Sequence, residues 1–461
     1  MNIRKLPLAA FITGLLGFSG VLLAGSYAPA SPIVLPDDIA LSPAVAIFRS
    51  FGSQGEFEEL KESEPVDSAP RNSVKVDDDG AQCPDAAFTT IQGAVDAGAN
   101  FIEICAGLYP ENVVIGTGLR TKLLGHGTGS TTVTGVAGTA GPIIDVSGGG
   151  QTNIEGLTVD GGSAMAGGVV TGIRYDASDG KIKDVEVLNI RDASGSSQGI
   201  GIRVQSTEGV PTRIKVVKTL VQNYSRGGID GNGMGVHLAV NRSDIVGPVA
   251  PVVWAPNGIQ VSRGAMGRIA DNVVDNNPSP DVPGGAGSGI ILFCAGASLV
   301  KDNTVTRADL GISIVDNALA RVERNDVSDS DFDAISLQFL GLFFGDIGCS
   351  APGIPLPVEN NNIYRNTLNN SDDGVTLENF DLASLVMTPN NNNICRNDIA
   401  NSFTDGIHVW EGADNVFDNN EIVSSGGTDA VDGTLGLGTA GTANTWQRND
   451  CTTSSPAGLC D

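Results

Sequence analysis

Four aspartates in the C-terminal part of the chain each stand directly before a short apolar segment that starts with Gly or Ala. They are Asp333, Asp373, Asp405 and Asp429. If these segments stacked as strands, the carboxylates would lie about 5 Å apart and would repel one another. A Ca²⁺ ion held by Asp333, Asp373 and Asp405 would relieve that repulsion. Neighbouring carboxylates could instead act as acid and base on a glycosidic bond, and the plainest alternative is a turn residue that bonds its own backbone.

A second column of polar side chains follows from a repeated Gly-Ile-x-apolar phrase, because strand alternation places its third residue on the outer face. The occupants of this position are Arg203, His237, Gln260, Ser313, Ser336, Thr376 and His408. Only three histidines occur in the chain, and two of them fall in this column. His408 would lie beside Asp373 and Asp405, and an aromatic residue, Trp410, follows it.

This arrangement predicts an acid–base site with an aromatic surface for a sugar ring. We expect Asp373, Asp405 and His408 to be catalytic. Contacts to the substrate are expected from Arg203, His237, Trp410 and Glu411. The competing interpretation is that a surface histidine in so acidic a protein meets carboxylates without any function. The sequence assigns no definite cofactor, and calcium is the metal that the carboxylate row suggests.

The elements that must position these residues form an internal repeat, which is the strongest signal in the sequence. An apolar-x-x-Asn phrase alternates with the Gly-Ile-x-apolar phrase, and the repeat length is 22 residues from Asn303 to Asn325 and 23 residues from Asn397 to Asn420. The asparagines of this phrase are Asn272, Asn303, Asn325, Asn366, Asn397, Asn420 and Asn449. Earlier copies carry Leu157, Val185, Val217 and Asp244 at the same position.

Units of this length, with two or three short strands and Gly or Asn at the corners, predict the coils of a parallel β-helix. Stacking places each coil about 4.8 Å above the last and aligns like residues in columns. Stacked carboxamides can bond one another, and Asn tolerates the left-handed conformation of a sharp bend. We therefore interpret all seven asparagines as scaffold and not as ligands.

The composition excludes several classes of protein. The 461 residues include 53 acidic and 27 basic side chains, which gives a net charge of 27 − 53 = −26, and they include 61 glycines. Nucleic acid is excluded as a partner, because its phosphates need clustered Lys and Arg. The hydrophobic content of 41% argues against disorder, and the sequence lacks the composition of a coiled coil and the period of collagen.

Residues 1–30 have the pattern of a secretory signal peptide, with Arg4 and Lys5 before an apolar run and Ala28-Pro29-Ala30 as a cleavage site. The alternative is an uncleaved anchor. Residues 31–73 are expected to form an acidic linker or pro-segment, and residues 74–461 the repeat domain. We expect a monomer that is secreted, periplasmic or at the cell surface, with no membrane span after signal cleavage.

Seven cysteines in an exported chain predict disulfides with one thiol left over. We expect two local pairs, Cys83 with Cys105 and Cys451 with Cys460. The pairing of the other three stays open: Cys294, Cys349 and Cys395. Two long insertions, 338–360 and 378–391, interrupt the repeat. They are expected either to flank the face that carries His408 or merely to cover a coil edge.

The chain from about Val74 to Asp461 resembles the right-handed parallel β-helix proteins of the pectate-lyase-like superfamily. Its start, Val76-Asp77-Asp78-Asp79-Gly80 followed by Phe88-Thr89-Thr90-Ile91-Gln92-Gly93-Ala94-Val95, is similar to that family's N-terminal cap and opening coil. Ala106-Gly107-Leu108-Tyr109-Pro110-Glu111-Asn112-Val113 and Gly125-His126-Gly127 resemble the opening coils of pectin methylesterases. The resemblance implies an all-β, single-stranded, right-handed parallel β-helix of about 11–13 coils, a fold that serves many functions.

The enzyme motifs of that superfamily are absent or out of order. Neither aspartate motif of the pectin methylesterases occurs, and Asp331-Phe332-Asp333-Ala334 is the nearest string. Gly125-His126-Gly127 and Arg213-Ile214-Lys215 match polygalacturonase motifs, but both precede Asp372-Asp373, which reverses the order of that family. The Asp-Pro-His-Asp motif of alginate epimerases is missing.

The sequence therefore leaves three functions open. The first is binding of a polysaccharide or cell-surface glycan, with or without activity on it. The second is a polysaccharide lyase or glycoside hydrolase acting on acidic glycans, which the negative charge of the protein would make dependent on a cation. The third is a non-catalytic structural or adhesive surface protein.

Overall fold

A computed structural model describes residues 72–461, except 117, 137–140, 163–169, 192–198, 207–208, 250–251, 253, 280–284, 318, 341–356 and 381–387. The signal peptide and nearly all of the acidic linker expected from the sequence lie outside the described residues, as do Cys349, most of the insertion at 338–360 and half of the insertion at 378–391. Within the described part, no helix is both long and apolar enough to span a bilayer.

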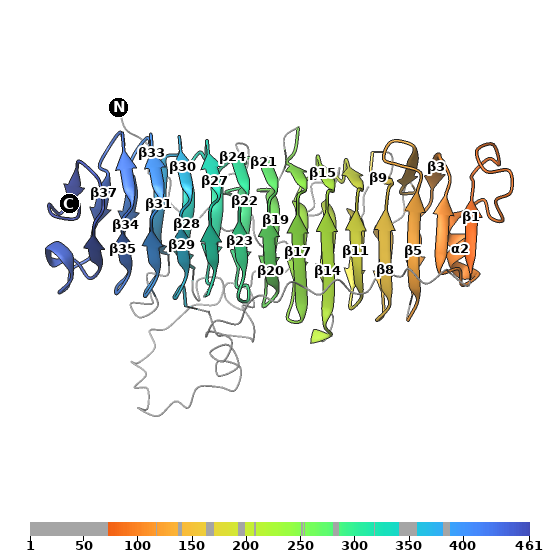
Figure 1. Ribbon diagram of the computed structural model, residues 1–461, viewed down its shortest axis with the longest axis horizontal. Helices are drawn as coiled ribbons and strands as arrows, with labels where there is room; N and C mark the ends of the chain where they lie inside the picture. Colours follow the sequence, from red (N-terminus) through yellow and green to blue (C-terminus); the bar gives the residue numbers. More distant parts are fainter. Residues whose placement is uncertain are drawn as a thin grey trace, which may run out of the picture. The chain divides into compact units, whose positions relative to one another are not determined.

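Three long parallel sheets run along the domain, and the chain visits them in a fixed order (Figure 1). Sheet A comprises β1 (Ser73–Val76), β2 (Phe101–Ile104), β5 (Arg120–Gly125), β8 (Gln151–Glu155), β11 (Asp179–Lys183), β14 (Thr212–Val217), β17 (Val236–Asn241), β20 (Met266–Ala270), β23 (Leu299–Lys301), β26 (Arg321–Glu323), β29 (Asn362–Tyr364), β32 (Asn393–Cys395), β35 (Val416–Asp418) and β38 (Thr445–Gln447). Sheet B comprises β3 (Gly107–Pro110), β6 (Thr131–Thr134), β9 (Thr158–Asp160), β12 (Glu186–Leu188), β15 (Leu220–Gln222), β18 (Asp244–Val246), β21 (Val273–Asn277), β24 (Thr304–Ala308), β27 (Asp326–Ser328), β30 (Thr367–Asn369), β33 (Asp398–Ala400) and β36 (Glu421–Val423). Sheet C comprises β4 (Val113–Ile115), β7 (Gly141–Ser147), β10 (Val170–Asp176), β13 (Ile200–Gln205), β16 (Gly227–Asn232), β19 (Asn257–Ser262), β22 (Ser288–Phe293), β25 (Leu310–Val315), β28 (Asp333–Phe339), β31 (Asp373–Asn379), β34 (Ile407–Val409), β37 (Ala430–Asp432) and β39 (Ser454–Ser455).

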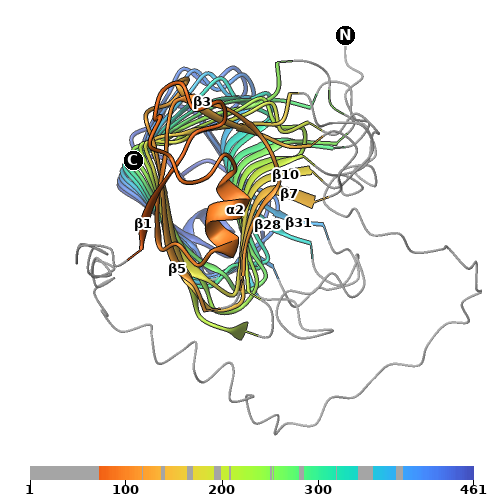
Figure 2. The same cartoon turned by 90° about the vertical axis from the view of Figure 1, so that its right-hand side faces the viewer.

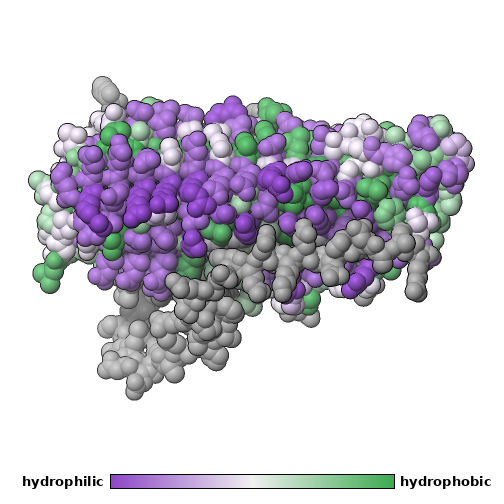
Figure 3. Space-filling model, viewed as in Figure 1, coloured by the Kyte–Doolittle hydropathy of each residue, from purple (hydrophilic) through white to green (hydrophobic). Residues whose placement is uncertain are grey.

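The 36 strands from β2 to β37 follow the order A, B, C twelve times among the described residues, so the domain has twelve complete coils. Each strand pairs in parallel with the equivalent strand of the next coil, as Val375 does with Ile407. This is the parallel β-helix that the repeat predicts, and twelve lies within the expected range of 11–13 coils. The face seen in Figure 3 carries mostly hydrophilic side chains over the C-terminal coils.

The interior is filled by columns of apolar side chains, chiefly Ile, Val and Leu, that point inward from all three sheets. A view along the axis shows the three walls and the short helix α2 (Ile91–Asp96) at the N-terminal end (Figure 2). Thr90 caps this helix, and the Glu111 carboxylate accepts hydrogen bonds from the backbone N–H groups of Ile91 and Gln92 (2.8 Å each). The capped helix therefore covers apolar side chains of the first coil.

The seven asparagines are scaffold, as expected. In each step of the ladder, the side-chain oxygen of one asparagine accepts from both the backbone N–H and the side-chain amide of the asparagine in the coil before. For example, Asn366 donates from N and from Nδ2 to Asn397 Oδ1, both at 3.0 Å. A second ladder of the same kind, which the sequence analysis missed, is formed by Asn361, Asn392, Asn415 and Asn444.

Two details of the repeat differ from the expectation. The left-handed backbone conformation belongs to the residue before the ladder asparagine, such as Arg365 (φ 55°) and Arg396 (φ 55°), and not to the asparagine itself. In the earlier coils, Thr219 and Ser243 occupy the ladder position, because the backbone N–H of Thr219 donates to Ser243 Oγ and that of Ser243 donates to Asn272 Oδ1. The assignments of Val217 and Asp244 to this position were therefore wrong by one or two residues.

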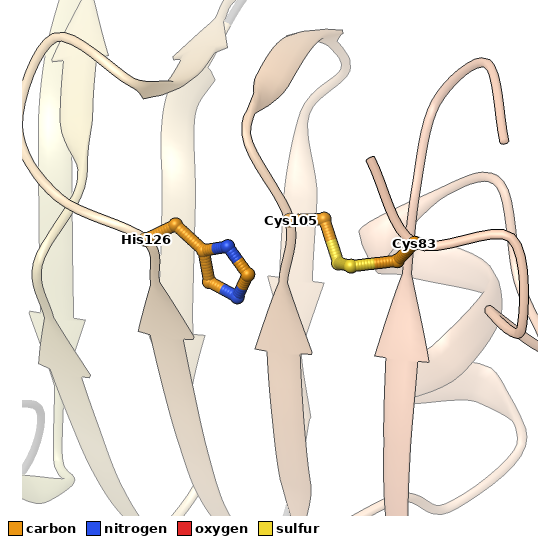
Figure 4. Close-up of side chains that lie close together, drawn as sticks. All are labelled: Cys83, Cys105 and His126. Atoms are coloured by element: carbon orange, nitrogen blue, oxygen red, sulfur yellow. A yellow bond between two sulfur atoms is a disulfide. The ribbon is translucent and has the colours of Figure 1, made fainter. Parts of the chain in front are cut away.

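Both predicted disulfides are present. Cys83 pairs with Cys105 at the N-terminal end, and Cys451 pairs with Cys460 in the C-terminal tail. Cys294 is also disulfide-bonded, whereas Cys395 is a buried free thiol. His126 lies on the same side as the first disulfide (Figure 4). Because both sulfurs of that pair are oxidised, the Cys83, Cys105 and His126 group cannot supply thiolates to a metal.

Candidate active site

The polar face of sheet C near the C-terminus brings together residues from three successive coils. Strand pairing places Asp333 beside Asp373, Ser336 beside Thr376 and then His408, and Gln338 beside Glu378. Asp405 follows Asp373 in the next coil, and Trp410 follows Val409 at the end of β34. We call this set the sheet C cluster: Asp333, Ser336, Gln338, Asp373, Thr376, Glu378, Asp405, His408 and Trp410.

A break in strand alternation puts residues three apart on the same side. The consecutive residues Gly374 and Val375 both donate their backbone N–H groups to the next coil, to the carbonyl oxygens of Asp405 and Gly406 (3.0 Å each). In a regular parallel strand, only every second N–H group donates to the same neighbouring strand. This local bulge turns Asp373 and Thr376 to the same outer face. Glycine is required at position 406, since a Cβ there would lie 2.1 Å from Ile422 Cγ2 and 2.5 Å from the carbonyl oxygen of Asp429, whereas the equivalent position in β28 is Ala334.

Hydrogen bonds fix the three aspartates of the cluster. Asp333 Oδ2 accepts from Thr376 Oγ1 (2.8 Å), and Asp373 Oδ1 accepts from the backbone N–H of Asp405 (2.7 Å). Asp405 Oδ1 accepts from the backbone N–H of Thr428 (2.7 Å), and its Oδ2 faces His408 Nδ1 at 2.8 Å. The carboxylates are therefore held by the chain itself, which gives the cluster one geometry.

Three carboxyl groups of the cluster hold their protons more tightly than usual. Burial raises the pKa of Asp373 to about 7. The hydrogen bond from the backbone N–H of Asp405 lowers this pKa, and the negative charges of Asp405 and Asp372 raise it further. Burial and the charge of Asp373 raise the pKa of Glu378 to about 7. Burial, together with the charges of Glu378 and Asp373, also raises the pKa of Asp333. At neutral pH the cluster therefore contains protonated acids.

Because of these raised pKa values, we expect the free energy of unfolding to fall as the pH rises. A carboxyl whose pKa is higher in the folded than in the unfolded chain binds its proton preferentially in the folded state, so stability is lost between about pH 4 and pH 7. We expect Glu378→Gln to reduce by roughly 2 kcal/mol the difference between the unfolding free energies at pH 5 and pH 8, measured with urea. The control is Glu421→Gln, because Glu421 is exposed on β36. Equal pH dependence in the wild type and Glu378→Gln would contradict this prediction.

His408 is oriented as a base. A carboxylate oxygen only accepts hydrogen bonds, so the contact with Asp405 Oδ2 places a proton on Nδ1 and leaves Nε2 of the neutral ring as an acceptor. Burial lowers the pKa of His408, and Asp405 acts in the opposite direction. The ring stacks on Trp410 (centroids 4.0 Å apart, interplanar angle 10°), while 56% of Trp410 remains exposed. An exposed indole beside a base can carry a sugar ring.

The other predicted site residues are placed as follows. Arg203 lies in the expected column, further toward the N-terminus. His237 does not: it lies on β17 of sheet A, and Asp230 holds the position in the sheet C column that the sequence analysis gave to His237. The phrase Gly235-Val236-His237-Leu238 leads into β17 and does not belong to a strand of sheet C. Glu411 lies directly after Trp410, and no hydrogen bond of its side chain occurs within the described residues.

Two further differences concern the acidic column. Asp429 lies one residue away from the expected column of aspartates. The residue beside Asp405 in the next coil is Thr428, and Asp429 lies beside Gly406. Asp429 instead accepts from the backbone N–H groups of Thr452 and Thr453, which lie in the following turn of the chain and not in the local turn that the alternative expected. Glu378 was missed, although its spacing of two residues from Thr376 in the same strand would have placed it on the outer face.

The distances between the carboxylates also bear on the expected calcium site. Within the described residues, the ligand atoms of Asp333, Asp373 and Asp405 do not gather within 4.8 Å of one another. The acidic residues that do gather so closely are Asp77, Asp78 and Asp79 in the N-terminal cap. Each carboxylate of the expected calcium set also accepts a hydrogen bond from the chain.

Comparison with solved structures shows where this fold occurs. A variant of the periplasmic alginate epimerase AlgG aligns with a TM-score of 0.51 and 11% identity over 77% of each chain. The chain has the right-handed parallel β-helix fold. The Dettilon tailspike protein gp208 aligns with a TM-score of 0.49 and 14% identity over 83% of this chain and 68% of that one. The catalytic unit of an α-1,3-glucanase from Streptomyces thermodiastaticus gives 0.47 and 13%, over 84% and 70%. No family model and no curated protein sequence matches the chain.

Proposed function

We propose that this protein binds a polysaccharide along the outer face of sheet C and cleaves it by acid–base catalysis at the sheet C cluster. One observation carries the proposal: the Asp405–His408 pair and the exposed Trp410 lie one coil from Asp373 and Glu378, whose carboxyl groups have pKa values of about 7. A neutral acid and an oriented base side by side are what general acid–base cleavage requires. The alginate epimerase with the same fold supports a polysaccharide as the substrate class.

The roles follow from the chemistry of each side chain. Trp410 stacks against a sugar ring and thereby fixes the position of the polysaccharide along sheet C. Asp373 or Glu378, protonated near pH 7, gives its proton to the oxygen of the glycosidic bond as that bond breaks. His408 Nε2 takes a proton from the attacking water, or from the ring carbon if the product is unsaturated, while Asp405 holds the imidazole in the required tautomer. Asp405 is thus a positioning residue.

Export is part of the proposal, since a polysaccharide substrate lies outside the cytoplasm. The signal-like pattern of residues 1–30 and the two disulfides support a secreted, periplasmic or cell-surface location. We propose that the exported protein acts as a monomer.

The test is a screen of the mature protein on neutral and acidic polysaccharides for new reducing ends and unsaturated products. We expect one of them to be cut, and we expect Asp405→Asn to lose most of that activity. His126→Ala is a matched control, because His126 forms the same kind of pair with Glu103 (2.9 Å) at the other end of the domain. Full activity of Asp405→Asn would overturn the site.

Two other outcomes have defined meanings. Each reaction is run with added calcium and with a chelator. Calcium-dependent activity that Asp333→Asn abolishes would assign Asp333, Asp373 and Asp405 to a metal instead, whereas calcium dependence that Asp333→Asn leaves unchanged would indicate a cation bridge to an acidic glycan. Neither binding nor cleavage of any polysaccharide would favour a structural or adhesive protein.

A further inference from the structure

The exposed aromatic side chains of the described residues all lie in the three coils of the sheet C cluster. They are Phe332, Phe403 and Trp410, which are 42%, 69% and 56% exposed. Elsewhere in the described part of the chain, aromatic side chains are buried or half-buried, and Tyr175 and Phe417 fill the interior. Because exposed apolar surface that gathers in one place marks a binding site, this distribution points to a ligand at the cluster.

Phe332 and Phe403 lie in one column, in the turns that lead from sheet B into sheet C. The backbone N–H of Asp373 donates to the carbonyl oxygen of Phe332 (3.1 Å), and that of Thr404 donates to the carbonyl oxygen of Asp372 (2.8 Å). In a parallel ladder, these bonds place Phe332, Asp372 and Phe403 at equivalent positions of successive coils. The two phenylalanines are therefore two coils apart, about 10 Å along the axis.

The acid–base pair lies between two of the exposed aromatic residues. In the coil of β34, Phe403 comes two residues before Asp405, and Trp410 comes two residues after His408. The chain from Phe403 to Trp410 spans at most about 23 Å. A polysaccharide that contacts both aromatic side chains therefore crosses the cluster with sugar units on each side of the bond that is broken.

Basic side chains are absent from this wall of the coil. From residue 309 to the C-terminus, the chain contains no Lys and five Arg, which are Arg321, Arg324, Arg365, Arg396 and Arg448. Arg321 belongs to β26, and each of the other four directly follows a strand of sheet A. Figure 2 shows β1 and β5 of sheet A on the opposite side of the coil from β28 and β31. From residue 309 onward, no Lys or Arg therefore occurs in sheet C or in its flanking turns.

This distribution of charge favours one class of substrate. Carboxylates accompany the aromatic residues, since Asp331 is exposed beside Phe332, Asp372 is half-buried and Glu411 follows Trp410. A polyuronate or a sulfated glycan would add negative charge to this wall and would find no basic side chain to pair with, which disfavours binding. The hydroxyl groups of an uncharged chain donate hydrogen bonds to carboxylates, and its apolar ring faces stack on aromatic side chains.

We propose that the sheet C cluster hydrolyses an uncharged polysaccharide at internal bonds, with Phe332 and Phe403 as stacking platforms on one side of the cluster and Trp410 on the other. The inference rests on the proposed function, and it specifies the substrate class and the type of reaction. Elimination is not available to such a substrate, because an uncharged sugar has no carboxyl group to acidify the neighbouring ring C–H.

The reaction consumes one water molecule for each bond broken. The oxygen of the water forms a bond to the anomeric carbon as the bond from that carbon to the glycosidic oxygen breaks. His408 Nε2 takes a proton from the water, and Asp373 or Glu378 gives its proton to the departing oxygen. The imidazolium then returns a proton to solvent and the carboxylate takes one up, so both groups regain their starting state.

The experiment starts from the polymer that is cut in the screen of the mature protein. We expect this polymer to be uncharged, and we expect its early products to be long fragments in size-exclusion chromatography, as internal cleavage gives. Oxidation of its primary hydroxyls to carboxylates gives a charged form of the same chain. By titration calorimetry, this form should bind at least tenfold more weakly than the parent, and its methyl ester, which is uncharged again, should recover binding.

Variants of the platform test its role in binding. Phe403→Ala should weaken binding of the uncharged polymer about tenfold, and Phe403→Tyr should retain binding because it keeps the ring. Phe332→Ala should weaken binding severalfold. The control is Leu108→Ala, because Leu108 is as exposed as Trp410 but lies on β3 of sheet B in the first coil, so we expect no effect. Thermal unfolding checks that each variant is folded.

The substrate class is overturned if only charged polymers are cut, if the products are unsaturated, or if the oxidised form binds as tightly as the parent. The platform is overturned if Phe403→Ala binds as the wild type does, or if Leu108→Ala weakens binding equally. In each of these cases, loss of activity in His408→Ala would leave the proposed function standing. Failure to bind or cut any polymer would overturn the proposed function as well.

Discussion

His408→Ala is expected to lower kcat/KM for polysaccharide cleavage by about 10²- to 10⁴-fold, the range that a positioned general base contributes. The reason is geometric. The His408 ring is held between Asp405 on one side and Trp410 on the other, and its neutral form leaves Nε2 as the basic atom. Alanine removes that base but leaves the inward columns of the coil untouched, so the protein should remain folded. The measurement is initial rate on the polymer that the screen identifies, with thermal unfolding as a check of the fold.

The pH profile separates a base from a structural residue. Burial lowers the pKa of His408 and raises those of Asp373 and Glu378 to about 7. Wild-type activity should therefore rise with pH through the His408 pKa and fall again near pH 7, as the acids lose their protons. His408→Ala should lose the rising limb. His126→Ala should keep both limbs, and an unchanged profile in His408→Ala would exclude the base role.

Asn397→Ala is expected to lower the free energy of unfolding by roughly 4 kcal/mol, although the residue is far from any chemistry. Asn397 is fully buried and donates from Nδ2 to Asn420 Oδ1 and to the carbonyl oxygen of Ile363, both at 3.0 Å. Its Oδ1 accepts two hydrogen bonds from Asn366, also at 3.0 Å. Alanine leaves the donors of Asn366 and the carbonyl of Ile363 buried without partners, each at a cost of about 1–3 kcal/mol.

The matched control for the ladder is the neighbouring Asn419. This residue is exposed and has a positive φ of 54°, a conformation that glycine adopts freely. Asn419→Gly should therefore change the unfolding free energy by less than about 1 kcal/mol. Urea unfolding followed by circular dichroism measures both variants. A small effect of Asn397→Ala, comparable to that of Asn419→Gly, would show that the ladder does not stabilise the fold.

The candidate site was predictable only in part. Asp373, Asp405 and His408 were identified because the Gly-Ile phrase gives the register of three adjacent coils, and strand pairing then follows from the repeat. His237 was misplaced because Gly235-Val236 imitates that phrase on a strand of sheet A. The phrase alone does not distinguish the two sheets, since both alternate apolar and polar residues. Only the pairing of complete strands separates them.

The sequence by itself determined the parallel β-helix, a range of coil numbers that includes the twelve observed and one of the two asparagine ladders, because residues that stack on one another recur at regular intervals along a repeat protein. The spacing of the cysteines also predicted two disulfides. The tertiary structure decided which sheet each phrase occupies, where the left-handed residues lie and which acids are buried. It alone showed that a bulge before Val375 and Ile407 turns Asp373 and Asp405 toward the face of Thr376 and His408. The physical reason is that a shift of one residue reverses every side chain in a strand, and burial and pKa values depend on that direction.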